Sequence, residues 1–354
     1  MTRTLRNLAT RTALCAVVAL AACARGTSTG APTPRASGAV TLASADVPAP
    51  PPARWLGLLG EYGDGAAWRI VAEQEGKLRL VDSALRVTPL TERESDFVTD
   101  SGSVPVRFTR DASGRATEML LGDARLARND IEPRPGTNQL RVTPVKPVES
   151  LRAEALAASP PAEAGPFVPN DLVELVRLDP SIKLEIRYAT TNNFLGTRFY
   201  DEPRAFLQRP AAEAVVRAHR ALRQQGYGLL IHDAYRPWYV TKMFWDATPI
   251  DRRWLVADPA QGSRHNRGAA VDLTLYDLAT GRPVEMPSTY DESTDRAYAD
   301  YPGGTTRQRW HRALLRRVME AEGFRANVTE WWHFDHSTWR SYAITNVPFD
   351  RLPR

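Results

Sequence analysis

Two short segments of this 354-residue chain carry the side chains best suited to hold a metal ion. His265 and Asp272 form the first segment, and Glu330 and His333 form the second. Two imidazoles and one carboxylate leave the fourth position of a tetrahedral zinc site to water, which is the arrangement of a catalytic centre. A glutamate beside that water can act as a general base, so the four residues together predict metal-assisted hydrolysis.

The spacing of these residues indicates which local structures must present them. Residues separated by an odd number point to opposite faces of a regular strand, so His265 and Asp272 cannot be partners on one strand. Gly268 between them permits a turn, which places His265 on a loop that enters the strand bearing Asp272. Glu330 and His333 lie three residues apart and therefore share one side of a helix or turn.

The chain has only six histidines, which limits the choice of imidazole ligands. His219 and His311 lie in stretches with helical patterns, where a packing role is favoured. His232 lies in a predicted strand, so packing or support of a ligand is favoured over metal binding. His336 is an alternative to His333 as a ligand, because it follows only three residues later in the same segment.

The first residues of the chain have the pattern of an export signal. Three arginines precede an apolar run at residues 13–20, which is typical of a signal peptide and short for a permanent membrane-spanning helix. Leu20-Ala21-Ala22-Cys23 resembles a bacterial lipobox, which predicts removal of residues 1–22 and lipid on Cys23. An ordinary signal with an incidental cysteine is the alternative. The protein is expected in the cell envelope, anchored to a membrane and facing the periplasm or exterior.

Cysteine usage and charge narrow the chemistry further. Cys15 and Cys23 are the only cysteines, so the body of a processed chain would lack disulfides and thiolate ligands. Any metal must be held by His, Asp and Glu, and Asp233 and Asp335 are further carboxylates that could orient such ligands. The composition is that of a globular protein, and a net charge of +5 gives no argument for a nucleic-acid partner.

Composition also divides the chain into segments. Residues 23–53 are rich in Pro and Ala and are predicted to form a tether, and the proline-containing residues 146–169 are predicted to form a linker. Residues 54–145 alternate short β-prone pieces with turn signals, which predicts a small all-β domain. Residues 170–354 mix helical and strand patterns, which predicts an α+β domain with mixed helices and a small antiparallel sheet.

Within the last segment, periodicity and end signals locate the main elements. The patterns predict strands at 182–188, 227–233 and 270–276, and helices at 210–225 and 305–322. The third strand carries Asp272.

Residues 170–345 contain a set of motifs in a fixed order. The motifs are Arg187-Tyr188-Ala189-Thr190-x-Asn192-Asn193-Phe194, Gly226-Tyr227-Gly228-Leu229-Leu230, Asp233-x-Tyr235-Arg236-Pro237, Ser263-x-His265-x-x-Gly268-x-Ala270-x-Asp272, Asp272-Leu273-Thr274-Leu275-Tyr276 and Glu330-x-Trp332-His333. Together they resemble the zinc D,D-peptidase superfamily, and most closely its D-alanyl-D-alanine dipeptidases. The chain departs from that pattern at Ala234, where glycine is common, and at Arg264 and Asn266, where serine is common.

The resemblance implies roles for the residues that match these motifs. His265, Asp272 and His333 would bind one Zn²⁺ per chain. Glu330 would take a proton from the attacking water and later give it to the leaving amine. Arg236 would stabilise the oxyanion that forms as the amide carbon becomes tetrahedral.

The resemblance also implies a substrate and residues that bind it. Asp291, assisted by Tyr188, would receive the ammonium group of the substrate, and Ser263 would lie near its carboxylate. The implied activity is zinc-dependent hydrolysis of the dipeptide D-alanyl-D-alanine in peptidoglycan turnover. A D,D- or L,D-carboxypeptidase acting on stem peptides and a non-catalytic lipoprotein that binds cell-wall fragments are the alternatives.

Overall fold

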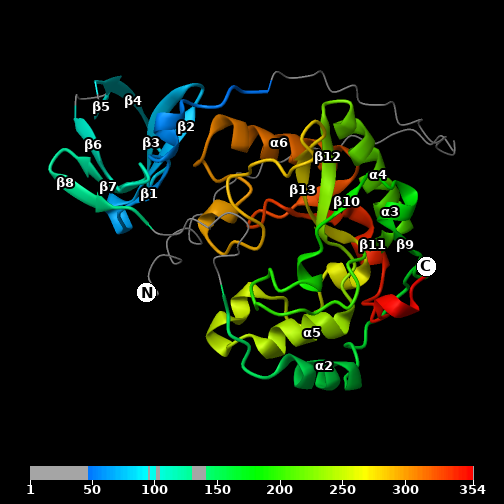
Figure 1. The fold of residues 1–354 in the computed structure, drawn as a ribbon. Coiled ribbons are helices and arrows are strands. Elements are labelled where there is room, and N and C mark those ends of the chain that lie inside the picture. The colour runs from blue at the N-terminus through cyan, green and yellow to red at the C-terminus, as the bar shows by residue number, and fades with distance from the viewer. Residues whose placement is uncertain (1–46, 95, 101–103, 130–140, 354) are drawn as a thin grey trace, which may run out of the picture.

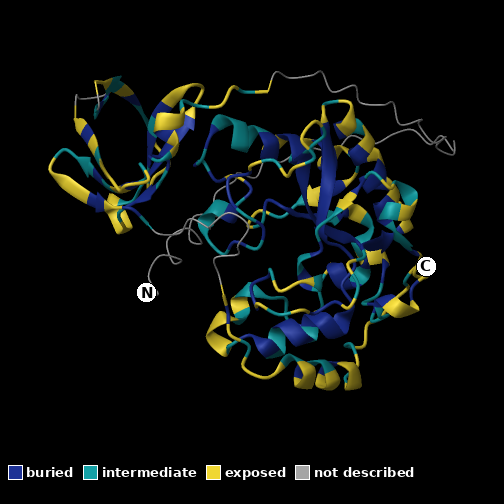
Figure 2. Ribbon diagram, in the orientation of Figure 1, coloured by how far each residue is buried: buried dark blue, intermediate teal, exposed yellow. Residues whose placement is uncertain are grey.

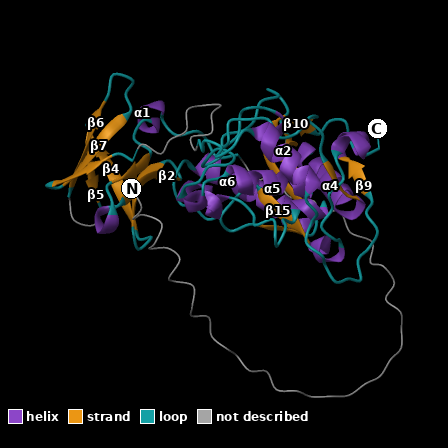
Figure 3. Cartoon of the chain, turned by 90° about the horizontal axis from the view of Figure 1, so that it is seen from below, coloured by secondary structure: helices purple, strands orange, loops and turns teal. Residues whose placement is uncertain are grey.

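The chain folds into a strand-rich N-terminal unit and a larger unit that mixes helices and strands (Figures 1 and 3). The computed structural model describes residues 47–94, 96–100, 104–129 and 141–353. The predicted signal peptide, Cys23 and most of the predicted tether lie outside the described residues. Among the described residues, no helix has the length and apolar character needed to cross a membrane.

The N-terminal unit is an eight-stranded antiparallel meander in which each strand pairs with the next. An isolated bridge between Tyr62 and Arg128 links its two edges, so the sheet is nearly closed. A short helix, α1 (Ala53–Leu56), precedes it, and a 3-10 helix (Gly65–Ala67) follows the first strand. The strands are β1 (Gly60–Tyr62), β2 (Arg69–Gln74), β3 (Lys77–Asp82), β4 (Val87–Arg93), β5 (Asp96–Thr99), β6 (Pro105–Arg110), β7 (Ala116–Leu121) and β8 (Ala124–Ala127).

Apolar side chains fill the interior of this N-terminal sheet. Leu78, Val106 and Met119 alternate with more exposed neighbours along their strands and are almost completely buried. The Arg128 guanidinium also enters the interior, where it donates hydrogen bonds to backbone carbonyl oxygens. Those bonds satisfy a buried charge that would otherwise destabilise the fold. The unit therefore has a hydrophobic core of its own.

The larger unit is built around a five-stranded sheet with the order β10-β12-β13-β15-β14. Its neighbouring strands are antiparallel except for β10 and β12, which are parallel, so the predicted antiparallel sheet is mixed at one edge. Two further strands, β9 (Leu172–Glu174) and β11 (Phe206–Gln208), pair with each other. The five strands are β10 (Lys183–Leu184), β12 (Tyr227–Asp233), β13 (Ala270–Asp277), β14 (Phe324–Ala326) and β15 (His333–His336).

Helices cover this sheet, and β12 and β13 are buried almost throughout (Figure 2). Helix α6 begins with a capping box, in which the Thr305 hydroxyl accepts the Gln308 N–H and the Gln308 side chain accepts the Thr305 N–H. The helices are α2 (Val148–Ala157), α3 (Leu175–Leu178), α4 (Arg209–Arg223), α5 (Trp238–Ala247) and α6 (Thr306–Ala321), with 3-10 helices at Arg187–Ala189, Ile250–Leu255, His265–Arg267, Asp295–Ala297, Ser337–Ser341 and Phe349–Arg351.

Two segments differ from their predicted conformation. Residues 182–188 are strand only at Lys183–Leu184 and then turn into a 3-10 helix. The reason is tertiary, because the Tyr188 ring is buried and its carbonyl oxygen accepts two backbone N–H groups from residues 199 and 200. Residues 146–169, predicted to be a linker, contain helix α2, whose Leu151 and Ala155 are fully buried in the core of the larger unit.

Candidate active site

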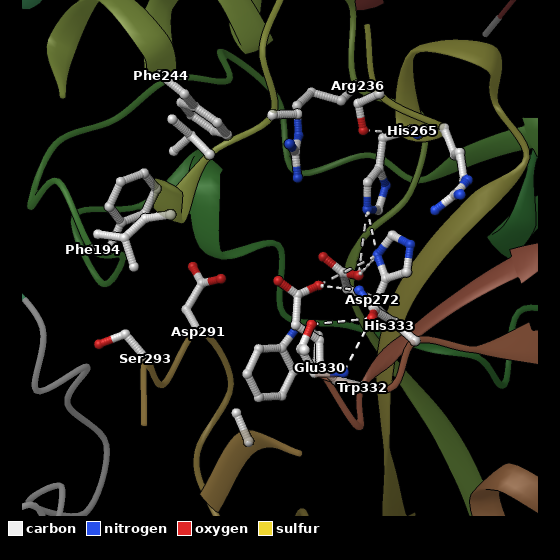
Figure 4. Close-up of a pocket in the computed structure, with 18 of the residues that line it drawn as sticks. Phe194, Arg236, Phe244, His265, Asp272, Asp291, Ser293, Glu330, Trp332 and His333 are labelled. Carbon is white, nitrogen blue, oxygen red and sulfur yellow. Dashed lines mark hydrogen bonds and ion pairs between the residues drawn. The ribbon is translucent and has the colours of Figure 1, made fainter. Parts of the chain in front are cut away.

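The three predicted metal ligands meet at one end of β13 and β15, which are inner strands of the five-stranded sheet (Figure 4). Asp272 of β13 pairs directly with His333 of β15, and His265 lies in the 3-10 helix that leads into β13. Asp272 Oδ1 lies 2.9 Å from His333 Nδ1 and 3.4 Å from His265 Nε2, and the two ring nitrogens are 3.1 Å apart. Ligand atoms at about 2.0 Å from a tetrahedral zinc ion lie about 3.3 Å from one another, so the separations fit this metal.

Each imidazole is oriented by an acceptor on its other nitrogen. His265 Nδ1 donates to the carbonyl oxygen of Ala234 at 2.7 Å, and His333 Nε2 donates to Asp335 Oδ1 at 2.9 Å. With a metal bound, these bonds would leave the lone pairs of His265 Nε2 and His333 Nδ1 free to ligate it. Ligand histidines in metal sites are held in this way, so the donor set fits a zinc ion in its chemistry as well as its spacing.

The electrostatics of the cluster favour a bound cation. Burial lowers the pKa of His333, but the hydrogen bonds to Asp272 and Asp335 outweigh burial and raise that pKa to about 10. Burial opposes ionisation of Asp272, yet His265 and His333 hold its pKa well below the usual range. A buried carboxylate beside two imidazoles therefore attracts positive charge, which a metal ion supplies in exchange for protons.

Glu330 lies beside the ligands on a tight turn. The His333 N–H donates to the Glu330 carbonyl oxygen at 3.1 Å, and Glu330 Oε2 lies 3.9 Å from His333 Nδ1. Asn327 Nδ2 donates to the same carboxylate oxygen at 3.2 Å. Burial raises the pKa of Glu330, an effect that the positive charge of His333 opposes. A raised pKa makes this carboxylate a stronger base than a free glutamate, which suits a group that accepts a proton from water and returns it.

Arg236 is fixed on the opposite side of the cavity. Its Nε and Nη2 atoms both donate to Asp233 Oδ2, at 2.9 and 2.7 Å, and the Tyr200 hydroxyl donates to Asp233 Oδ1 at 2.7 Å. The guanidinium also lies over the rings of Tyr188 and Phe244. A buried and immobile cation of this kind can stabilise negative charge that develops on a substrate oxygen.

Asp291 and Ser263 face the same cavity. Asp291 adopts a left-handed backbone conformation with φ near 60°, and its Oδ2 atom accepts a hydrogen bond from the Tyr188 hydroxyl at 2.9 Å. Burial, together with the charge of Asp272, raises the pKa of Asp291 to about 7. Ser263 Oγ accepts the backbone N–H of His265 at 3.2 Å. All eight predicted site residues line one cavity of about 930 Å³.

The remaining histidines lie outside the ligand group, as predicted. His219 Nδ1 accepts the backbone N–H of Leu229 at 3.0 Å, and burial lowers the pKa of His219 to about 4. His232 stacks on the ring of Tyr290. His336 packs against an aromatic ring in β14 and bonds to a threonine hydroxyl, which excludes it as the alternative to His333 in this conformation.

Several residues that hold the metal ligands or Arg236 in place were not predicted from the sequence. The Tyr290 hydroxyl donates to Asp272 Oδ2 at 3.0 Å, and Arg264 forms an ion pair with Asp335 at 3.0 Å. Asn266 donates to the carbonyl oxygen of Arg236 at 2.8 Å, so a residue that departs from the family pattern ties the His265 loop to Arg236. Their only sequence signal was their position next to predicted site residues.

The cavity combines three residues that fit a metal ion, a carboxylate base and the immobile Arg236 guanidinium. The comparisons with known proteins agree with this arrangement. Residues 169–347 match the peptidase M15 family, described as D-ala-D-ala dipeptidase. The D-alanyl-D-alanine dipeptidase of Escherichia coli (strain K12) is 34% identical over 175 residues, which are 49% of this chain and 89% of that protein. The D-alanyl-D-alanine dipeptidase of Enterococcus faecium is 35% identical over 171 residues, 43% of this chain and 85% of that protein.

The matched range also shows where the likeness ends. The D-alanyl-D-alanine dipeptidase of Enterococcus faecalis (strain ATCC 700802 / V583) is 33% identical over 183 residues, which cover 47% of this chain and 91% of that protein. The family match contains every predicted site residue and begins after the N-terminal sheet. The chain therefore belongs to the D-Ala-D-Ala dipeptidase family of metallopeptidases, within the zinc D,D-peptidase superfamily.

Proposed function

We propose that this protein hydrolyses the dipeptide D-alanyl-D-alanine with one zinc ion held by His265, Asp272 and His333. The observation that carries the proposal is the convergence of this donor set with Glu330 and Arg236 in one cavity. Zinc in such a site lowers the pKa of water and polarises a carbonyl group. The presence of all three ligands and the base argues against a non-catalytic binding protein.

The side chains around the site divide the chemical work. Glu330 accepts a proton from the attacking water and returns it to the amine that leaves, as its raised pKa permits. Arg236 donates to the oxygen of the scissile amide as negative charge develops there. Asp233 and Tyr200 hold the guanidinium so that little reorganisation is needed during the reaction.

Asp291 explains why a free dipeptide is the best candidate substrate. Its carboxylate pairs with the ammonium group of the dipeptide, the Tyr188 hydroxyl orients it, and Ser263 lies near the substrate carboxylate. At the end of a stem peptide the corresponding nitrogen is an uncharged amide, which would leave the Asp291 carboxylate without a cation once substrate fills the cavity. An unpaired charge covered by substrate is costly, so this contact disfavours the carboxypeptidase alternative.

The role of Glu330 is tested by the substitution Glu330→Gln in protein loaded with zinc. D-Ala release from D-alanyl-D-alanine should fall by about 10²–10⁴-fold, because general acid and base catalysis is lost. Zinc content, measured by mass spectrometry, should stay at one ion per chain. Glu320→Gln, on the surface of α6, is the matched control and should retain full activity. Full activity in Glu330→Gln would refute this mechanism.

We also propose that the protein acts in the cell envelope, in peptidoglycan turnover, as a lipoprotein anchored through Cys23. The support is the sequence pattern of residues 1–23, with the Pro- and Ala-rich residues 23–53 acting as a tether. Protein expressed with its full N-terminus should partition with membranes, whereas Cys23→Ser should not. Wild-type protein that carries no lipid and stays in the aqueous fraction would contradict the anchor but not the activity.

A further inference from the structure

One segment, residues 286–305, joins the active-site cavity to the N-terminal sheet. Its middle part, from Asp291 to Tyr298, lies in the cavity wall, and it ends at Thr305, which caps α6. Figure 1 shows its yellow and orange ribbon on the side of the larger unit that faces β2. The family match includes this segment but not the sheet, so the contact with the sheet is an addition to the matched region.

The first attachment of the segment to the sheet is a buried hydrogen-bonded carboxylate. The Tyr301 hydroxyl donates to Glu61 Oε1 at 2.9 Å, and Trp68 Nε1 donates to Glu61 Oε2 at 3.1 Å. Tyr301 is 5% exposed and Glu61 is 8% exposed. The Tyr301 ring belongs to a small apolar cluster on the outer face of β2 and β3, with Ile70, Ala72 and Val81.

The second attachment fixes the end of the segment. The Glu73 N–H donates to the carbonyl oxygen of Gly304 at 3.0 Å, and Glu73 Oε2 accepts the Thr306 N–H at 2.7 Å. Arg309 Nη2 donates to the Glu73 carbonyl oxygen at 2.6 Å. The sheet therefore provides an acidic side chain at the N-terminus of α6, where negative charge is stabilised.

The middle of the segment is bonded to the turn that carries Glu330. The Trp331 N–H donates to the carbonyl oxygen of Ala297 at 2.8 Å, and the Ala299 N–H donates to that of Val328 at 3.1 Å. The backbone that leads from Tyr301 toward Asp291 thus passes directly beside the catalytic turn. These two bonds hold the catalytic turn and the middle of the segment together, so loosening beyond them is expected mainly at Asp291.

The conformation of Asp291 needs external support. A left-handed backbone in a residue other than glycine is strained and persists only where the surroundings fix it. On the cavity side, the Tyr188 hydroxyl and the neighbouring Tyr290–Asp272 bond hold this residue. Toward the C-terminal end of the segment, the first contact with the N-terminal sheet is the Tyr301–Glu61 hydrogen bond.

We propose that the N-terminal sheet holds the substrate-binding segment in place, with Glu61 and Tyr301 as positioning residues for Asp291. The expected effect on KM rests on the proposed function, in which Asp291 binds the substrate ammonium. Because that contact exists before and during the reaction, its loosening raises KM more than it lowers kcat.

The test compares two tyrosine hydroxyls in the intact zinc-loaded protein. Tyr301→Phe removes the bond to Glu61, whereas Tyr62→Phe removes a buried hydroxyl that donates to the Leu58 carbonyl oxygen and accepts from Arg128 Nη1, both within the N-terminal unit. Tyr301→Phe should raise KM for D-alanyl-D-alanine about three- to tenfold, the equivalent of one hydrogen bond, and change kcat by less than about twofold. Glu61→Gln has one acceptor oxygen for the two donors Tyr301 and Trp68, so its KM should lie between those of wild type and Tyr301→Phe.

Hydrogen exchange of residues 289–299, measured without substrate, gives a readout that does not depend on activity. Exchange there should be faster in Tyr301→Phe and unchanged in Tyr62→Phe. The proposal is overturned if Tyr301→Phe leaves both KM and exchange as in wild type, or if Tyr62→Phe changes them equally. A wild-type protein that does not cleave the dipeptide would refute the proposed function, and the exchange rates would still decide whether the sheet holds the segment.

Discussion

The two sheets of this protein use buried charge in opposite ways. In the N-terminal sheet, Arg128 and Glu61 are each bonded to fixed partners, so their charges are satisfied within the fold. In the five-stranded sheet, Asp233, Asp272 and His333 form a row across three adjacent strands, and a register shift next to Asp233 interrupts the ladder there. Bulges of this kind are common beside active sites, where they re-aim side chains.

The buried charges of the N-terminal sheet therefore stabilise its fold, whereas those of the five-stranded sheet are placed to bind a ligand. Among the described residues, His265, Asp272 and His333 form the one group of three that could hold a metal ion. The strand interiors beside them, such as Leu273 and Leu275, are fully buried and apolar. A rigid apolar sheet can therefore hold three polar groups at one point, although they gain full stabilisation only with a cation between them.

The strongest test of this contrast is removal of a ligand. Asp272→Ala should lose bound zinc and essentially all activity, because two imidazoles alone leave the site incomplete. Asp277→Ala, at the far end of the same strand, removes a carboxylate that bonds to the Thr280 turn and should keep both zinc and activity. Zinc content and D-Ala release are the measurements. An active, zinc-loaded Asp272→Ala protein would show that the metal is held elsewhere.

A smaller effect is expected when the fixed cation is altered. Arg236→Lys keeps the charge but loses the paired hydrogen bonds to Asp233, so kcat should fall about 10²–10³-fold with zinc retained. Arg204→Lys is the matched control, because Arg204 forms a similar paired contact with Glu174 outside the cavity. Equal losses of kcat in the two variants would indicate a general effect on folding.

Support of a ligand should matter less than the ligand itself. Asp335→Asn weakens the hold on His333 Nε2 and should lower zinc affinity about 10–100-fold, as measured by competition with a chelator. Activity at saturating zinc should be largely retained. Unchanged zinc affinity would mean that β15 packing alone orients His333.

The smallest effect on activity is expected from the core of the N-terminal sheet. Met119→Ala removes a fully buried side chain and should lower the free energy of unfolding of that unit by about 2–5 kcal/mol. The value of kcat should not change at temperatures where the sheet remains folded. Denaturant unfolding followed by tryptophan fluorescence gives the stability. A parallel loss of kcat would show that the two regions are less separate than their cores suggest.

Local signals explain which parts of the structure the sequence could predict. The strand at 227–233 and the helix that starts after Thr305 match their predictions, because an apolar run and a helical period are encoded in neighbouring residues. The ligands were recognisable because few histidines exist and their spacing is characteristic. The strand predicted at 182–188 was largely wrong because burial of Tyr188 overrides its local pattern.

Long-range contacts explain what the sequence could not predict. The Tyr290–Asp272 bond joins residues 18 apart, and the Tyr301–Glu61 bond joins residues 240 apart. Nothing in the local sequence distinguishes these tyrosines from others in the core. Helix α2 in the proline-containing residues 146–169 is also stabilised by packing, because two of its side chains are buried against the rest of the larger unit.

The central claim is tested most directly by comparing D-alanyl-D-alanine with its N-acetylated form as substrates of the zinc-loaded protein. The free dipeptide should be cleaved to D-Ala, and the acetylated one should have a kcat/KM lower by at least about 10²-fold, because Asp291 would lose its cationic partner. Failure to cleave the free dipeptide, or equal kcat/KM values for the two, would contradict the account.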